Sequence, residues 1–146
     1  MSVALIKNVI VVAASQGRYI HYESNAHPEF ADIAAPGEGP DQQGWGTSFA
    51  APRVTQLAAQ IIEKYPRLNN EQVRLAILLG AKHSSGLPVR SEGILSPKES
   101  FAIAKGLYEE GLERLPEILS DVYCTFTNSE CKMQQQKLNI YRSQLF

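Results

Sequence analysis

Residues 46–52 read GTSFAAP, and this stretch decides how the rest of the chain is interpreted. Ser48 lies between Gly46 and a run of small residues, just before a segment with helical apolar periodicity, so its hydroxyl is predicted at the opening of a helix. Backbone N–H groups are unpaired at such an opening, and the helix dipole stabilises negative charge there. A serine that attacks a carbonyl needs those donors. The triplet GTS alone, however, favours an ordinary helix cap.

The complete stretch resembles the nucleophile motif of subtilisin-like serine proteases, G-T-S-x-A-[AS]-P. Other segments over about residues 3–105 resemble the same family in the same order: 8–14 (NVIVVAA), 22–25 (YESN), 30–38 (FADIAAPGE), 64–66 (KYP) and 69–73 (NNEQV). The resemblance implies that Ser48 is the nucleophile of a serine endopeptidase, in a motif that includes Gly46 and Thr47. It also implies that the Ser48 N–H is one oxyanion donor. The implied substrate is a peptide or protein that pairs as an added strand.

The family's catalytic triad runs in the order Asp, His, Ser, but this chain holds only the serine motif. It contains no D-[ST]-G, no H-G-T and no A-G-N segment for the oxyanion asparagine. Its histidines and aspartates are His21, His27, His83, Asp32, Asp41 and Asp121, and none lies in a catalytic motif of the family. The resemblance gives Asp32 a structural position and leaves His27 in a loop. We expect none of the histidines to act as the base for Ser48.

Without a base, Ser48 is an ordinary alcohol. Removing the serine or histidine of a subtilisin lowers turnover on the order of a millionfold, which is roughly 8 kcal/mol of barrier. We therefore expect the chain to be inactive by itself. One hypothesis is the C-terminal part of a serine endopeptidase, with Asp and His supplied by an absent part or by a partner chain.

The alternative is a non-catalytic remnant that acts as a structural or protein-interaction module. An upstream reading frame with D-[ST]-G and H-G-T would favour the enzyme, whereas intergenic sequence would favour the remnant. A third reading is an unrelated α/β domain with a fortuitous helix cap. The five further matching segments argue against this reading.

Size and charge exclude several function classes. With 146 residues, 44% of them hydrophobic, the chain has the size of one domain. A net charge of −1 and scattered Lys and Arg residues give no footprint for nucleic acid or an anionic membrane. No apolar run approaches the roughly 20 residues of a membrane span, since Lys7 and Asn8 interrupt residues 3–14. The N-terminus lacks the basic region and cleavage site of a signal peptide, and the localisation is left undetermined.

Cys124 and Cys131 are the only cysteines. Their spacing fits a disulfide in an oxidising compartment and equally two free thiols, and no second ligand pair supports a zinc site. No carboxylate cluster of the calcium-binding kind is found in the sequence. Neither a metal nor another cofactor is therefore predicted.

The predicted fold class is α/β, with a partial parallel sheet of two to three strands and three to four helices. Residues 3–14 are predicted as a strand buried on both faces, because β-branched apolar residues dominate the run. A polar loop follows, with a short extended piece at 19–23, and a second strand is predicted at 31–35. A Gly- and Pro-rich loop over 37–46 then leads to the nucleophile.

The first predicted helix begins near Ser48, because apolar residues over 54–65 recur at i, i+3, i+4 and i+7. Pro66 marks its end. Where the family has an Ala-Gly pair after P-x-V, this chain has Thr55 and Gln56. That departure predicts looser or more exposed packing of the helix.

Two further helices are predicted from their capping residues. Asn69 and Gln72 fit a capping box that opens a helix ending near Gly80. Residues 96–99 (SPKE) supply a capping serine, a proline at the first helical position and a glutamate at the third.

Beyond about residue 106 the resemblance fades, so the chain is divided in two. Residues 1–105 are predicted as the C-terminal part of the catalytic domain, and residues 106–146 as a helical C-terminal extension. Helical spacing of apolar residues continues into the extension, and Pro116 restarts a helix. Residues 125–146 are left open as a helix, a partner-binding segment or a poorly ordered tail.

Overall fold

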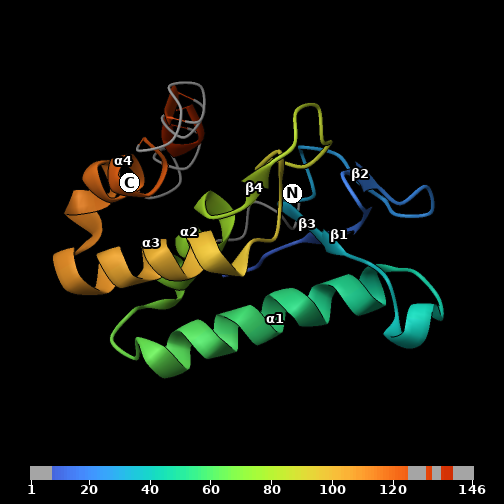
Figure 1. Cartoon of the computed structure of the whole chain (residues 1–146), viewed down its shortest axis with the longest axis horizontal. Coiled ribbons are helices and arrows are strands. Elements are labelled where there is room, and N and C mark those ends of the chain that lie inside the picture. The colour runs from blue at the N-terminus through green and yellow to red at the C-terminus, as the bar shows by residue number, and fades with distance from the viewer. Residues whose placement is uncertain (1–7, 125–130, 133–135, 140–146) are drawn as a thin grey trace.

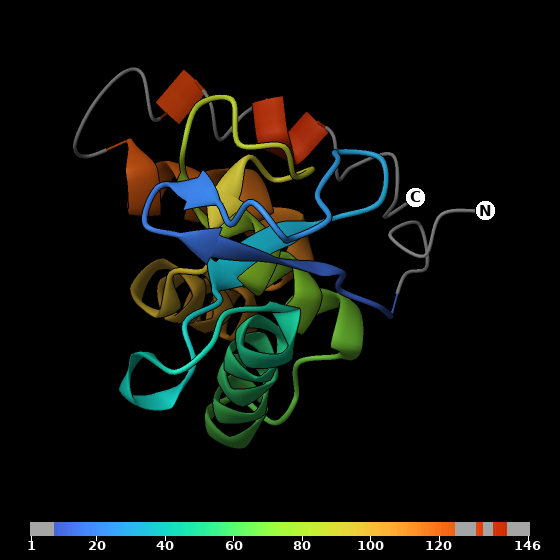
Figure 2. The ribbon, with the colours of Figure 1, turned by 90° about the vertical axis from the view of Figure 1, so that its right-hand side faces the viewer.

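The strands form one mixed sheet, and helices pack against one of its faces (Figure 1, Figure 2). The computed structural model describes residues 8–124, 131–132 and 136–139. The strands are β1 (Val12–Gln16), β2 (Tyr19–Ile20), β3 (Ile33–Pro36), β4 (Lys82–His83) and β5 (Gly93–Ile94). The helices are α1 (Thr47–Lys64), α2 (Asn70–Leu79), α3 (Pro97–Glu110) and α4 (Leu115–Tyr123), with short 3-10 turns η2 (Pro40–Gln42) and η3 (Leu112–Arg114).

The sheet has the strand order β2-β1-β3-β5-β4, in which β1 pairs with β3 and β3 with β5 in parallel. The two edge strands, β2 and β4, pair antiparallel to their neighbours. The predicted α/β class with a partial parallel sheet is therefore confirmed. The sheet exceeds the two to three strands expected, because β2, β4 and β5 have two residues each and are too short to show a periodicity in the sequence.

The first strand begins later than predicted. The sheet pairing starts at Val12 and runs to Gln16, while residues 3–7 of the predicted strand lie outside the described residues. Before Val12, side chains satisfy the backbone: the Val11 N–H donates to Asp32 Oδ2 at 2.9 Å, and the Arg74 Nε donates to the Val9 carbonyl at 3.2 Å. Side chains thus replace strand pairing at this end of β1.

The two faces of the sheet are covered differently. Ala14, Ile33 and Ala35 belong to the main core, together with the buried sides of α1, α2 and α3. Ala13 and Ala34 alternate to the other face and join a smaller cluster with Ala31, Leu87 and Val89. Figure 2 shows α1 and α3 on one side of the sheet and the yellow-green loop before β5 on the other. Both faces of β1 are buried, as predicted for the strand within residues 3–14, and both faces of β3 are buried as well.

Helix α1 is close to its predicted bounds and buries Ala50, Val54, Leu57 and Ile61 against the core. Thr55 and Gln56 stand where the family has an Ala-Gly pair, and both are exposed. This confirms the more exposed packing predicted at these positions. No helix in the described part of the chain is both long and apolar enough to cross a membrane.

The capping box at the start of α2 is confirmed. Asn69 Oδ1 accepts the Gln72 N–H at 2.8 Å, and Gln72 Oε1 accepts the Asn69 N–H at 2.9 Å. At the start of α3, Ser96 occupies the cap position, but it makes no side-chain cap. The Ser96 hydroxyl instead donates a hydrogen bond to the Glu99 carboxylate. A charged carboxylate is a strong acceptor for such a bond. The predicted capping role of the Ser96 side chain was wrong.

The extension continues as η3 and α4 after Gly111, whose φ of 89° ends α3. Pro116 lies in the first turn of α4, as predicted, and Leu115 and Leu119 are buried. Cys124 and Cys131 form a disulfide, which resolves the alternative left open by the sequence. The division at 105/106 stays a prediction and falls inside α3; most of 125–146 lies outside the described residues.

Candidate active site

The turn that carries Ser48 is built against the carboxyl ends of β1 and β3. The Gly46 N–H donates to the Gly37 carbonyl at 2.9 Å, and Glu38 and Trp45 form an isolated antiparallel bridge. Gly37 lies directly on β1, since a Cβ there would be 2.6 Å from the Ala14 Cβ. Only glycine allows this approach. Ser48 therefore lies where ligands bind in open α/β sheets.

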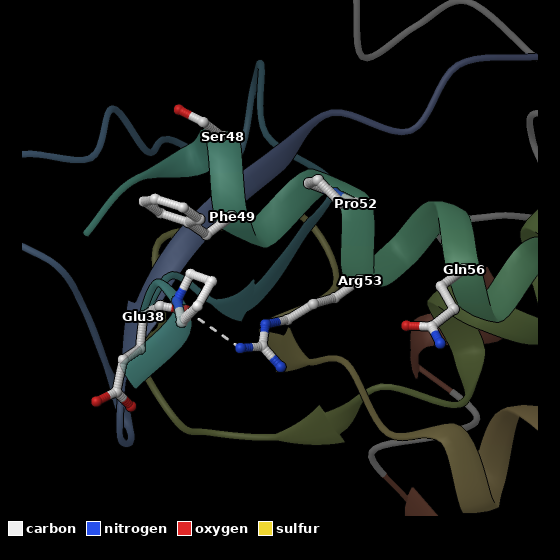
Figure 3. Close-up of a pocket in the computed structure, with 7 residues that line it drawn as sticks. Glu38, Ser48, Phe49, Pro52, Arg53 and Gln56 are labelled. Carbon is white, nitrogen blue, oxygen red and sulfur yellow. Dashed lines mark hydrogen bonds between the residues drawn. The ribbon is translucent and has the colours of Figure 1, made fainter. Parts of the chain in front are cut away.

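Ser48 presents both its hydroxyl and its backbone donor to solvent. Its residue is exposed, and in Figure 3 the hydroxyl points away from Glu38 and Arg53. The Gly46 carbonyl accepts the N–H groups of Phe49 and Ala50 at 3.1 and 3.2 Å. Within the described residues, the N–H groups of Thr47 and Ser48 donate to no carbonyl. Backbone N–H groups without an acceptor can stabilise negative charge that develops on a carbonyl oxygen held beside the hydroxyl.

The loop before Ser48 is fixed to α1 by two side chains. The Phe49 ring packs against Gly39 and Gly44, so that a Cβ at either glycine would lie 3.0 or 3.4 Å from it. The Arg53 Nη2 donates to the Glu38 carbonyl at 3.1 Å. Between loop and helix lies an open depression of about 280 Å³, lined by Glu38, Pro40, Ser48, Phe49, Pro52, Arg53 and Gln56 (Figure 3).

The histidines are engaged elsewhere. His21 is buried and stacks on Trp45 with ring centroids 5.2 Å apart, and its Nδ1 accepts the Glu23 N–H. His27 is exposed in a loop, and His83 lies in β4. No histidine or aspartate of the described chain hydrogen-bonds to Ser48. The stack of His21 on the residue three positions before Ser48 was not foreseen, because nothing in the sequence joins these segments.

Asp32 is buried in the sheet and serves the fold. Its Oδ1 lies 3.6 Å from Arg74 Nη2, and its Oδ2 accepts the Val11 N–H. Burial raises the pKa of the Asp32 carboxyl, while the Val11 N–H and the guanidinium groups of Arg74 and Arg90 act in the opposite direction. A carboxyl with no exposed surface cannot reach a substrate at Ser48.

The described residues also hold no group of three His, Cys, Asp or Glu side chains placed to bind a metal ion. The candidate site thus consists of Gly46, Thr47 and Ser48 on the turn, with the depression beside them. Its chemistry depends on the serine hydroxyl and on backbone donors.

Comparisons with known proteins identify the family of the chain and support its fold. The family model of the Subtilase family matches residues 2–102. A chain from a solved structure titled "Structural basis of subtilase cytotoxin SubAB assembly" is similar, with a TM-score of 0.58 and 22% identity. The similarity covers 73% of this chain and 39% of that chain, and at this identity it shows the fold alone. A search of curated proteins finds no significant match. The family match spans most of the chain, and the chain therefore belongs to the subtilase family.

Proposed function

We propose that the chain is the nucleophile-bearing part of a subtilisin-like serine endopeptidase. The observation that carries the proposal is the exposed Ser48 with open N–H groups, at the carboxyl ends of two parallel strands in a subtilase. The chain spans 39% of the chain that it resembles in the subtilase cytotoxin structure, and we assign the rest of the site to another polypeptide segment. That segment would supply the Asp and the His.

In the completed site, the Ser48 oxygen attacks the carbonyl carbon of a peptide bond while the supplied histidine takes the hydroxyl proton. The carbonyl oxygen becomes an oxyanion and accepts the Ser48 N–H. The C–N bond then breaks, the histidine gives its proton to the departing amine, and an acyl ester remains on Ser48. Water, deprotonated by the same histidine, hydrolyses the ester and restores the hydroxyl.

The free edge of β1 supports completion by a further strand. Pairing with β3 uses the odd-numbered residues, because the Asp32 and Gly37 N–H groups donate to the Val11 and Ser15 carbonyls. The backbone groups of Ile10 and Val12 therefore face the opposite edge, where β2 reaches only Ser15 and Gln16. Within the described residues they have no partner. A strand added parallel to β1 would end beside the turn of Ser48.

The alternative is a non-catalytic subtilase remnant that acts as a structural or interaction module. It is favoured by one observation: among the described residues no base is hydrogen-bonded to Ser48. The two proposals agree on the isolated chain, for which we expect no peptidase activity. They differ in what happens when the missing strand and the triad partners are added.

A fluorophosphonate probe, which reacts with activated serines, tests the proposal. The isolated chain, its Ser48→Ala variant and an exposed-serine control, Ser85→Ala, are labelled with and without a polypeptide that carries the D-[ST]-G and H-G-T motifs, taken from any upstream reading frame that encodes them. We expect labelling only with that polypeptide, lost in Ser48→Ala and kept in Ser85→Ala. A complex that forms but is not labelled would favour the remnant. Labelling of the isolated chain that Ser48→Ala abolishes would show that it is active alone.

A further inference from the structure

The depression beside Ser48 has the composition of a binding site for a single side chain. Its walls are Pro40, Phe49 and Pro52, and its charged groups are Glu38 and Arg53. Its volume of about 280 Å³ lies below the roughly 300–1,000 Å³ of pockets for drug-sized ligands. One amino-acid side chain fits this space better than a cofactor does.

Arg53 has guanidinium donors for which the described residues supply a single acceptor, the Glu38 carbonyl. The hydrogen bond from its Nη2 to the Glu38 carbonyl holds the guanidinium over the loop. The ion pairs found among the described residues are Arg74–Asp32 and Arg114–Glu117, so Arg53 has no carboxylate partner there. Figure 3 shows the Glu38 carboxylate directed away from the guanidinium. The remaining guanidinium N–H groups are thus available to a ligand.

The walls around the guanidinium are fixed. Two of them are proline rings, and the third is the Phe49 ring, which packs against Gly39 and Gly44. Arg53 is exposed and the depression is open, so a ligand can reach the guanidinium from solvent. The guanidinium fork matches a carboxylate in two parallel bonds, a geometry that an amide cannot reproduce.

We propose that this depression binds an acidic side chain of the substrate polypeptide and that Arg53 is its anchor. Arg53 lies five residues after Ser48 on α1, a rise of about 7.5 Å along the helix. Ser48 also lines the depression, so we assign the acidic side chain to the polypeptide that is cleaved at Ser48. The assignment of the ligand as substrate rests on the proposed function, whereas its binding does not require catalysis.

An NMR titration of the ¹⁵N-labelled full chain tests the site with three small peptides. The peptides are acetyl-Ala-Asp-Ala-amide, its Asn analogue, and acetyl-Ala-Ala-Ala with a free carboxylate. We expect the Asp peptide to shift the amide signals of Phe49 and Gln56 saturably, on the order of millimolar, and roughly tenfold more tightly than the Asn peptide. Salt should weaken this binding.

Three variants identify the anchor. Arg53→Gln should abolish the preference for Asp over Asn, and Arg53→Lys should keep a reduced preference because it retains the charge without the fork. Arg67→Gln removes the same charge at an exposed position over the Tyr108 ring and should behave as wild type. If Arg53→Gln does not fold, the proposal is tested by the Arg53→Lys variant and by the ratio of the wild-type affinities for the Asp and Asn peptides.

Equal affinity for the Asp and Asn peptides, or an unchanged preference in Arg53→Gln, would overturn the proposal. Equal binding of the free-carboxylate peptide would overturn the assignment to a side chain in favour of a chain terminus. The probe-labelling experiment and this titration fail independently. An unreactive Ser48 leaves the peptide binding unchanged, and a depression without Asp preference leaves the labelling unchanged.

Discussion

At the start of α1, the N–H groups of Thr47 and Ser48 donate to no carbonyl of the described residues, whereas two carbonyls at and just after the end of α2 accept hydrogen bonds from buried side chains. The Tyr123 hydroxyl donates to the Leu79 carbonyl at 2.8 Å, and the Lys137 Nζ donates to the Ala81 carbonyl at 3.3 Å. Open donors suit a site that must bind a developing charge, and covered acceptors suit a region that holds the fold.

The covering groups come from the extension. Tyr123 and Lys137 lie beyond residue 102, where the family match ends, and Leu138 beside Lys137 is buried in the main core. The end of α2 is therefore stabilised by residues outside the matched segment, while the nucleophile turn lies inside it. We expect changes in the extension to alter stability and changes at Ser48 to alter only chemistry.

The largest expected effect is at Lys137, because the side chain that carries its ammonium group is buried. Burial lowers the pKa of Lys137 to about 8 from its ordinary value of 10.5, and Glu92 acts in the opposite direction. Between pH 8 and 10.5 the unfolded chain binds more protons, so stability rises with pH in this window, and the cost is fully present below pH 8. A shift of one pKa unit corresponds to about 1.4 kcal/mol. Because Lys137→Met removes this titrating group, the difference in unfolding free energy between wild type and variant should change by roughly 3 kcal/mol from below pH 8 to above pH 10.5.

The measurement is urea unfolding of wild type and variant at pH 7 and pH 11. We expect the difference in unfolding free energy between the two proteins to shift in favour of wild type at the higher pH. Lys132→Met removes the same charge from an exposed position and should show no such shift. A difference that stays constant with pH would mean that the Lys137 ammonium is solvated.

The next effect in size concerns the disulfide that ties the segment with Lys137 to α4. Its cysteines are seven positions apart, and closing a loop of this length contributes about 2 kcal/mol by restricting the unfolded chain. Cys124→Ser with Cys131→Ser should lower the free energy of unfolding by about that amount. Reducing agent should lower the stability of wild type equally and leave the variant unchanged. Loss of stability in the variant under reducing agent would point to another cause.

Helices and the nucleophile turn were predictable because their signals are local. The capping box of Asn69 and Gln72 and the apolar spacing of α1 both act within one or a few helical turns, and both are confirmed. The motif around Ser48 predicted the opening of α1, which begins at Thr47. Its catalytic role stays a prediction.

Contacts between distant segments left no signal in the sequence. Arg74 and Asp32 are 42 positions apart, Lys137 and Ala81 are 56 apart, and the stack of His21 on Trp45 joins two loops. Strands of two residues, such as β2, are likewise defined by their partners and not by their own composition. The pairing of Cys124 with Cys131 could not be predicted for a related reason, because a spacing of seven residues fits both a disulfide and two free thiols.

The smallest expected effect is at the nucleophile itself, and it sharpens the comparison most directly. The Ser48 side chain is exposed and makes no hydrogen bond within the described residues, so Ser48→Ala should change the unfolding free energy by less than about 0.5 kcal/mol. Ser91→Ala is the matched control, because Ser91 is fully buried and its Oγ accepts the Gly93 N–H. The same change there should cost about 1–2 kcal/mol, since it leaves that N–H unsatisfied. A Ser48→Ala variant as destabilised as Ser91→Ala would mean that the nucleophile turn also stabilises the fold, and the contrast with the end of α2 would not hold.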